Sequence, residues 1–304
     1  MPGGRYLKDR IGLYLLFSAA ILTFSVAVLV LPYETVYVES RDGLMLFLAV
    51  MIACVFVFLL GTMYNMLIWM QGKGLVGAPE RRLLRAMSVA LKVVVSRRFW
   101  KALGVFAKDG LYLSKLKGRS RLRWFMHLLI LGGFALMFVL DLVVTFSLDI
   151  LRYGPMIDED GWAKMWVRDF AFDLAGLMML VGLSIAAVRR FVFRPKIVRT
   201  ELPDAVSVVF LLLIVLGGFV LEGMGLAAHM EDHTVNHEYS FVGYLFSLAT
   251  PPSVSEFYDE FWLVHGVMSA LFIAYIPFSK LFHMIATPIA IEVDGLVSKE
   301  VSGA

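Results

Sequence analysis

Histidines are the residues of this chain whose type and spacing best suit chemistry. Of the six histidines, three stand inside long apolar stretches: His127, His265 and His283. An imidazole is costly within a membrane unless it has a partner. Hydrogen bonding inside a helix bundle is one use for such a side chain, and binding a metal is the other. The elements that carry these histidines decide between the two uses.

Those elements are apolar enough to cross a bilayer. Of the 304 residues 60% are hydrophobic and 17% are charged, and the mean hydropathy is +0.78. Six continuous apolar blocks are each long enough for a helix that spans about 30 Å of hydrocarbon. The sequence therefore predicts an all-α integral membrane protein, a bundle of six transmembrane helices. The predicted spans are 11–31, 44–70, 124–148, 167–188, 205–228 and 261–283.

Basic residues predict the orientation of these spans. Most of the 28 lysines and arginines fall at the start of the chain, in the connector 71–123, in the connector 189–204 and near the end. The positive-inside rule then makes both termini cytoplasmic, in the membrane of a prokaryotic cell. The net charge of +3 reflects this topology and predicts no nucleic-acid partner. We expect amphipathic helices of the connector 71–123 to lie on membrane lipid, as an anchor or as a docking platform.

The spacing of the three membrane histidines favours a haem. His265 and His283 are eighteen residues apart, which on one helix is five turns, about 27 Å, on the same face. His127, near the cytoplasmic end of the third span, matches the depth of His283. Two imidazoles at one depth on antiparallel helices can clasp a b-type haem, with the iron between them. The single cysteine, Cys54, excludes a CxxCH haem attachment.

His265 lies near the outer end of its helix and predicts a second haem there. The third span offers Met137 as the opposite ligand, ten residues after His127, because a thioether also binds haem iron. Packing alone would also explain this methionine, which is one of 17. His229 is the alternative ligand. We expect two haems b, with the inner one as the minimum.

Three histidines of an outer segment follow an HxxxHxxxH pattern: His229, His233 and His237. On a helix they could bind zinc or copper. Acidic residues surround them, which favours a solvated loop.

Lys164 and Asp169 stand where the fourth span begins, near the predicted depth of His265. A quinol releases two protons with its two electrons, so its site needs such hydrogen-bonding groups beside a haem. The alternative is a pair that fixes the depth of the helix at the interface. Two haem-free functions also stay open: a proton-coupled transporter that relays protons through Asp141, Asp173 and Glu222, and a structural membrane anchor.

The segments around the haem-ligand candidates resemble a known family. The stretch WFMHLLILGGF that contains His127 is similar to the first haem-ligand helix of the nitrate reductase gamma subunit. The stretch from His265 to His283, with its PFSK step, resembles the last helix of that subunit. The segment RRFVFRP after residue 188 is similar to its cytoplasmic connector. The resemblance covers about residues 44–290.

The resemblance implies two stacked b haems, with His127 and His283 on the inner one and His265 on the outer one. Where the family has a second histidine, this chain has Met137. An extra first span and the long basic connector are more similar to the cytochrome b subunits of heterodisulfide reductase and of the membrane complex associated with dissimilatory sulfite reduction.

Such subunits exchange electrons between a membrane quinone or methanophenazine and a cytoplasmic iron–sulfur subunit of the heterodisulfide-reductase type. For this chain we expect a carrier of the menaquinone type, and further membrane and extracytoplasmic subunits. The resemblance thus implies an electron-transfer subunit in sulfur respiration that is not catalytic alone. The expected division of the chain is an N-terminal helix and outer loop (1–43), a cytochrome b bundle (44–290) and a cytoplasmic tail (291–304).

Overall fold

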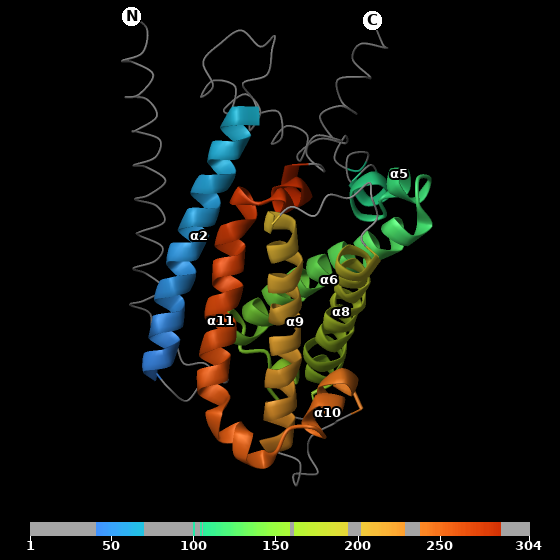
Figure 1. Cartoon of the computed structure of the whole chain (residues 1–304). Helices are drawn as coiled ribbons and strands as arrows, with labels where there is room; N and C mark the ends of the chain where they lie inside the picture. Colours follow the sequence, from blue (N-terminus) through green and yellow to red (C-terminus); the bar gives the residue numbers. More distant parts are fainter. Residues whose placement is uncertain are drawn as a thin grey trace, which may run out of the picture. The chain divides into compact units, whose positions relative to one another are not determined.

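The structure, a computed structural model, describes residues 41–69, 100, 104, 106–158, 161–193, 202–228 and 238–286. Every regular element in these ranges is helical (Figure 1). The first predicted span, most of the basic connector and the C-terminal tail lie outside the described residues. The predicted all-α class is therefore confirmed for the part of the chain that the structure describes.

Five helices in the described part are long and apolar enough to cross a membrane. They match the second to sixth predicted spans, and their bounds are Gly43–Asn65, Arg121–Leu148, Lys164–Phe193, Ala205–Ala228 and Ser253–Phe278. The sixth crossing, at 11–31, and the cytoplasmic placement of both termini stay predictions.

The chain separates into two compact units, one made of residues 1–106 and 270–304 and the other of residues 107–269. Most of α11 (Tyr258–Tyr275) belongs to the second unit, and its last turns belong to the first. The division predicted at residues 43 and 290 stays a prediction, because the flanking segments, apart from residues 41–43, lie outside the described residues.

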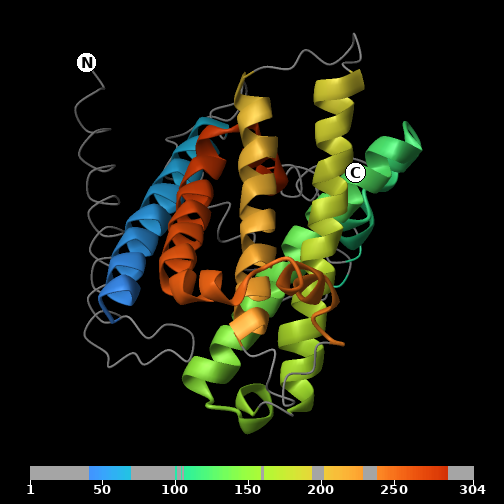
Figure 2. The ribbon, with the colours of Figure 1, turned by 60° about the horizontal axis from the view of Figure 1, so that its bottom comes forward.

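Three long helices form the frame of the second unit: α6 (Arg121–Thr145), α8 (Phe172–Ala187) and α9 (Leu202–Ala228). Helix α8 packs against both α6 and α9 (Figures 1 and 2). Glycines permit the close approach of α6 and α8. A Cβ at Gly133 would lie 2.7 Å from the carbonyl oxygen of Ala175, and one at Gly182 would lie 2.7 Å from Cγ1 of Ile130. Small residues at such contacts are typical of membrane helices.

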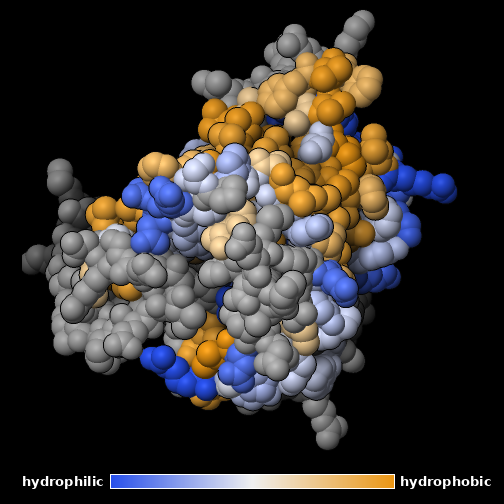
Figure 3. All heavy atoms as spheres, turned by 90° about the horizontal axis from the view of Figure 1, so that it is seen from below, coloured by the Kyte–Doolittle hydropathy of each residue, from blue (hydrophilic) through white to orange (hydrophobic). Residues whose placement is uncertain are grey.

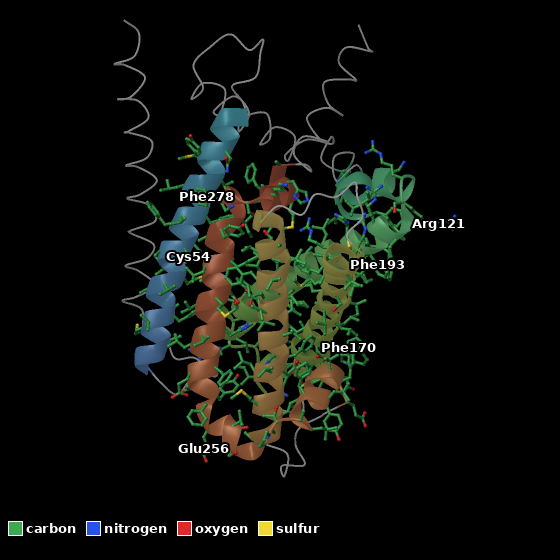
Figure 4. The ribbon with its side chains drawn as sticks, viewed as in Figure 1. Cys54, Arg121, Phe170, Phe193, Glu256 and Phe278 are labelled. Carbon is green, nitrogen blue, oxygen red and sulfur yellow. The ribbon has the colours of Figure 1, made fainter. Side chains whose placement is uncertain are left out.

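Arg121 and Phe193 lie at one end of the second unit, and Glu256, just before α11, lies at the other (Figure 4). Helix α6 therefore begins where the α8 segment ends, and the two run antiparallel. His127 follows Arg121 by six residues, so it belongs to the first of these ends. His265, in the early turns of α11, belongs to the half of the helix that starts near Glu256.

Turns with π-helical hydrogen bonding extend the spans of the second unit. They are η2 (Phe146–Ile150), η3 (Lys164–Ala171) and η4 (Val188–Phe193). Between η2 and η3 lies the short helix α7 (Gly154–Ile157), and an apolar cluster packs there: Val144, Leu148, Met156 and Ala163. Sequence patterns do not reveal π turns, which occur mostly as single turns inside α-helices and often at functional sites.

A short helix, α10 (Phe241–Ser247), packs against α9 and α8. Asp173, which is only 1% exposed, holds its first turn. One carboxylate oxygen accepts a hydrogen bond from the amide of Val242 at 2.6 Å, and the other accepts one from Gly243 at 3.3 Å. A 3-10 segment, η5 (Pro252–Phe257), then leads into α11.

In the first unit, α2 (Arg41–Trp69) packs against η6 (Ile276–Phe278), the first of two 3-10 turns that follow α11. A Cβ at Gly61 would lie 2.8 Å from Pro277, so the absence of a side chain there permits the contact. Asn65 Nδ2 donates a hydrogen bond of 2.5 Å to the carbonyl oxygen of Pro277. Figure 4 labels Cys54 on α2 and Phe278 on η6.

The sides of the helices are rich in exposed apolar residues. On α6, Phe138 is 59% exposed and Leu142 is 55% exposed. In Figure 3 hydrophobic residues gather into a continuous patch on one flank. A soluble protein would bury such surfaces, whereas lipid solvates them.

Two short helical turns precede α6 in the described part of the basic connector: η1 (Phe106–Leu111) and α5 (Ser114–Lys117). Lys117 Nζ donates to the Tyr112 hydroxyl at 2.5 Å and lies 4.8 Å from the centre of the Trp124 ring. The basic clusters that predicted amphipathic helices, around residues 81–85 and 97–98, lie outside the described residues.

Candidate functional site

His127 lies in the second turn of α6, and its ring is tied to its own helix. Ser120 precedes α6, and its hydroxyl accepts a hydrogen bond from the amide of Arg123 at 3.4 Å. The Nδ1 atom of His127 lies 2.8 Å from the carbonyl oxygen of Arg123, one turn earlier. Because a carbonyl oxygen only accepts, Nδ1 carries the hydrogen, and in the neutral imidazole Nε2 then carries the lone pair. This is the tautomer that metal-binding histidines commonly adopt.

His283 has the same local arrangement in the first unit. Its Nδ1 lies 2.5 Å from the carbonyl oxygen of Lys280. The ring is exposed, and the residue follows directly on η7 (Lys280–Phe282). The same reasoning assigns the lone pair to Nε2.

The helix that carries His265 does not continue unbroken to His283, so the predicted five regular turns are wrong. Helix α11 ends at Tyr275, the turn η6 follows, and Ser279 is extended with φ −112° and ψ 172°. Pro277 has no amide hydrogen to continue the helical ladder, and the Ser279 hydroxyl accepts from the amide of Leu281 at 3.1 Å to start a new turn. Rotation per residue along one helix therefore does not relate the two histidines.

The two histidines predicted to hold the inner haem belong to different units, His127 to the second and His283 to the first. Their pairing at one haem stays a prediction. What the structure provides for each is a membrane-helix end and an Nδ1 bond to a backbone carbonyl of the same segment.

The imidazole of His265 is held differently, against the backbone of another helix. A Cβ at Gly217 of α9 would lie 3.0 Å from its Nδ1, and a Cβ at Gly218 would lie 3.7 Å from its Cε1. Within the described part of the chain, neither ring nitrogen has a hydrogen-bond partner. A half-buried imidazole with no polar partner suits a ring that is to bind a metal.

Met137, the predicted outer ligand opposite His265, is half-buried on α6. It lies ten residues after His127, about 15 Å further along the helix towards the other end of the unit. Its role as an iron ligand stays a prediction. The alternative ligand, His229, lies outside the described residues, as does the whole HxxxHxxxH pattern. In the described ranges, no group of three or more histidine, cysteine or acidic side chains forms a metal site.

Lys164 and Asp169, the predicted quinol-binding residues, do meet. Lys164 Nζ lies 3.1 Å from Oδ2 of Asp169, and the side chains are only 8% and 14% exposed. Both belong to η3, where the i to i+5 bonding of a π-helix brings residues five apart to the same side. The ion pair supports either quinol binding or depth fixing, and the choice between them stays a prediction.

Aromatic residues lie near this ion pair in the sequence, and their rings pack against one another. Trp166 packs edge-on against Phe170 at 5.4 Å and against Tyr239 at 5.2 Å between ring centres. Phe170 in turn lies 5.9 Å from Phe241. Rings in such arrangements offer flat apolar surfaces beside polar groups.

A pair of carboxyl side chains deep in the second unit was not expected from the sequence as a pair. Asp173 of α8 and Glu222 of α9 are hydrogen-bonded to each other, and Glu222 also bonds Ser240 and contacts Gly243. The sequence does show the two acids inside apolar spans, which is the signal that they have partners. The third acid of the transporter alternative, Asp141, is exposed on α6.

Comparison with known proteins identifies the family. The model of the HdrE family, which describes the E subunit of dihydromethanophenazine:CoB--CoM heterodisulfide reductase, matches residues 103–291. The E subunit of that enzyme from Methanosarcina acetivorans is 28% identical over 197 residues, which are 62% of this chain and 65% of the relative. The corresponding protein of Methanosarcina barkeri is 27% identical with the same coverage.

A third relative carries a different name. The "EtfAB:quinone oxidoreductase" of Syntrophomonas wolfei is 21% identical over 250 residues, which are 78% of this chain but 32% of that protein. No solved structure gives a significant match. This chain spans about 65% of the length of the Methanosarcina relatives. The family match covers more than half of the chain and includes its described haem-ligand candidates, so this multi-pass protein of the cell membrane belongs to the HdrE family of heterodisulfide reductase membrane subunits.

Proposed function

We propose that the chain is a cytochrome b subunit that carries electrons between a menaquinol-type carrier at the outer side and a cytoplasmic iron–sulfur subunit of the heterodisulfide-reductase type. The observation that carries the proposal is the shared state of His127 and His283. Each Nδ1–H donates a hydrogen bond to a backbone carbonyl, so in the neutral imidazole Nε2 has the lone pair that would bind iron. Family membership and the names of the relatives support it.

In this proposal His127 and His283 hold the inner haem b, and His265 and Met137 hold the outer one, with His229 as the alternative to Met137. Haem supplies one-electron oxidation and reduction across the membrane when it is bound. The chain fixes the rings: the bonds to Arg123 and Lys280 orient the two inner imidazoles and make them more basic.

The quinol site lies at the start of η3 in this proposal. Lys164 would bind an oxygen of the carrier, and the Asp169 carboxylate would accept one of the two hydroxyl protons, the other passing to water at the outer side. The two electrons would leave one at a time to the haem. Their mutual contact of 3.1 Å keeps the cation and the acceptor beside each other. The rings of Trp166 and Phe170 provide a flat apolar surface for the head group.

The cytoplasmic partner docks at the basic connector 71–123 in this proposal, and further membrane and extracytoplasmic subunits complete the complex. Six spans with both termini in the cytoplasm would bring that connector to the same side as His127 and His283. The EtfAB:quinone oxidoreductase relative supports a quinone-type carrier, although this chain matches only about a third of that protein. The chain makes and breaks no substrate bond by itself.

Menaquinol reduction of the purified protein tests the proposal. After the oxidised protein is mixed with a reduced menaquinone analogue, its absorption spectrum should show the α-band of reduced b-type haem. A colourless preparation that still recruits the iron–sulfur subunit would instead support the structural anchor. A haem-containing preparation that quinol cannot reduce would contradict the proposed quinol site.

A further inference from the structure

The ring of His265 rests on a length of α9 backbone that has no side chains. The glycines at 217 and 218 both contact the ring, but at different distances. A Cβ at 217 would come within 3.0 Å of Nδ1, which is closer than ordinary van der Waals contact, whereas one at 218 would lie 3.7 Å from Cε1, which is ordinary contact. The two neighbouring positions thus differ in what a methyl group would do to the ring.

Other described groups fix the backbone of His265 but leave its ring to packing. Ser269 Oγ donates a hydrogen bond of 2.9 Å to the carbonyl oxygen of His265, which ties one turn of α11 to the next. No described residue bonds the ring nitrogens. Packing contacts therefore limit the rotation of the imidazole about its side-chain bonds, and the surface at Gly217 provides the closest contact of the two glycines.

We infer that Gly217 is a positioning residue, whose missing side chain sets the orientation of the His265 imidazole towards the outer haem. The inference rests on the proposed function and adds a residue to it. A methyl group at 217 has to displace the ring by a few tenths of an ångström. Because the ring is an axial ligand in the proposal, this displacement weakens or tilts its bond to iron, whereas a methyl group at 218 leaves the ring in place.

Gly217→Ala and Gly218→Ala form a matched pair that tests the inference. Both add one methyl group to the same helix, and both raise its helix propensity equally. We expect Gly217→Ala to shift or abolish the low-spin electron paramagnetic resonance signal of the outer haem and to let carbon monoxide bind the reduced outer haem. Gly218→Ala should match the wild type in both measurements. The inner-haem signal should stay unchanged in both variants, which reports that the bundle is folded.

A double variant keeps the test informative if Gly217→Ala does not fold. Removing the ring with His265→Ala removes what the new methyl group would meet. Gly217→Ala in that background should therefore have the same inner-haem signal as His265→Ala alone and at least the same thermal stability, because the alanine also raises helix propensity. A further loss of either in the double variant would mean that Gly217 acts on something other than the ring, and the inference would be overturned.

The outcomes also separate this inference from the proposed function. Equal spectra and equal carbon monoxide binding for Gly217→Ala and Gly218→Ala would overturn the positioning role alone. A His265→Ala variant that keeps both haem signals would overturn the outer-haem assignment on which the inference rests.

Discussion

The histidines proposed for the inner haem and the histidine proposed for the outer haem are held by different means. His127 and His283 each bond a backbone carbonyl of their own segment through Nδ1, so their tautomer is fixed locally. His265 has no such bond within the described residues, and its ring instead packs closely against the backbone of another helix at Gly217. A local bond survives small movements of neighbouring helices, whereas a packing contact does not. The outer site should therefore be the more sensitive of the two to changes in helix packing.

The largest effect should follow removal of an inner ligand. His283→Ala and His127→Ala should each abolish the same haem signal, because each deletes one of the two imidazoles that hold it. Low-temperature absorption and electron paramagnetic resonance of the purified variants would measure this. The exposed His283 should tolerate the substitution without loss of the fold. A His283→Ala variant that keeps its full inner-haem spectrum would contradict the proposal that His127 and His283 bind the same haem.

At the outer end, His265→Ala should remove the other haem and leave the inner signal intact. Met137→His sharpens the same comparison, because it exchanges a thioether for an imidazole and should lower the reduction potential of the outer haem only. Potentiometric titration would detect the shift. Met178→His, a methionine substitution on α8, serves as the control. An unchanged potential in Met137→His would remove Met137 as the ligand and favour His229.

Loss of the ion pair in η3 should affect only the reaction with quinol. Lys164→Gln removes one charged hydrogen bond, worth about 1.5–3 kcal/mol, so the quinol concentration for half-maximal reduction should rise about tenfold to a hundredfold. Stopped-flow reduction by a menaquinol analogue would measure it. Lys117→Gln, on the exposed α5, should have no effect on this reaction. If the quinol concentration for half-maximal reduction is unchanged in Lys164→Gln, the ion pair does not bind quinol and only fixes the depth of the helix in the membrane.

Asp173→Ala should lower the free energy of unfolding without removing a histidine ligand of the inner haem. It leaves the buried amides of Val242 and Gly243 without their acceptor, at a cost of about 1–3 kcal/mol in the free energy of unfolding. Because α10 packs on α8 and α9, the outer signal should broaden before the inner one does. Thermal unfolding in detergent would measure the loss, and Asp158→Ala at an exposed acid should be neutral. Equal stability of the two variants would contradict the role assigned to Asp173.

The smallest effect should come from Asn65→Ala in the first unit. It removes the hydrogen bond to the carbonyl oxygen of Pro277, worth about 0.5–1.5 kcal/mol. That bond holds the turn that precedes His283, so the inner haem alone should become easier to remove. Haem loss to apomyoglobin would follow this, with Tyr64→Phe as the neighbouring control. Faster loss of the outer haem instead would contradict the assignment of Asn65 to the inner site.

Apolar length alone predicted five helices that the structure describes, because a run of about twenty apolar residues leaves few alternatives in a membrane. The contact of Lys164 with Asp169 was harder to predict from the sequence. Residues five apart do not lie on the same side of a regular α-helix, and the π turns that bring them together have no sequence pattern. The break after Tyr275 was missed even though Pro277 signals it, because the regular spacing of His265 and His283 favoured one helix. Glu222 and Asp173 meet because α8 packs against α9, and no local sequence pattern predicts which residues of two packed helices lie opposite each other.

The haem content of the purified chain tests the central claim most directly. A pyridine haemochrome assay combined with quantitative amino-acid analysis should give two haems b for each chain, and one in His265→Ala. A colourless wild-type protein would contradict the electron-transfer account, and a ratio that His265→Ala leaves unchanged would contradict the outer site.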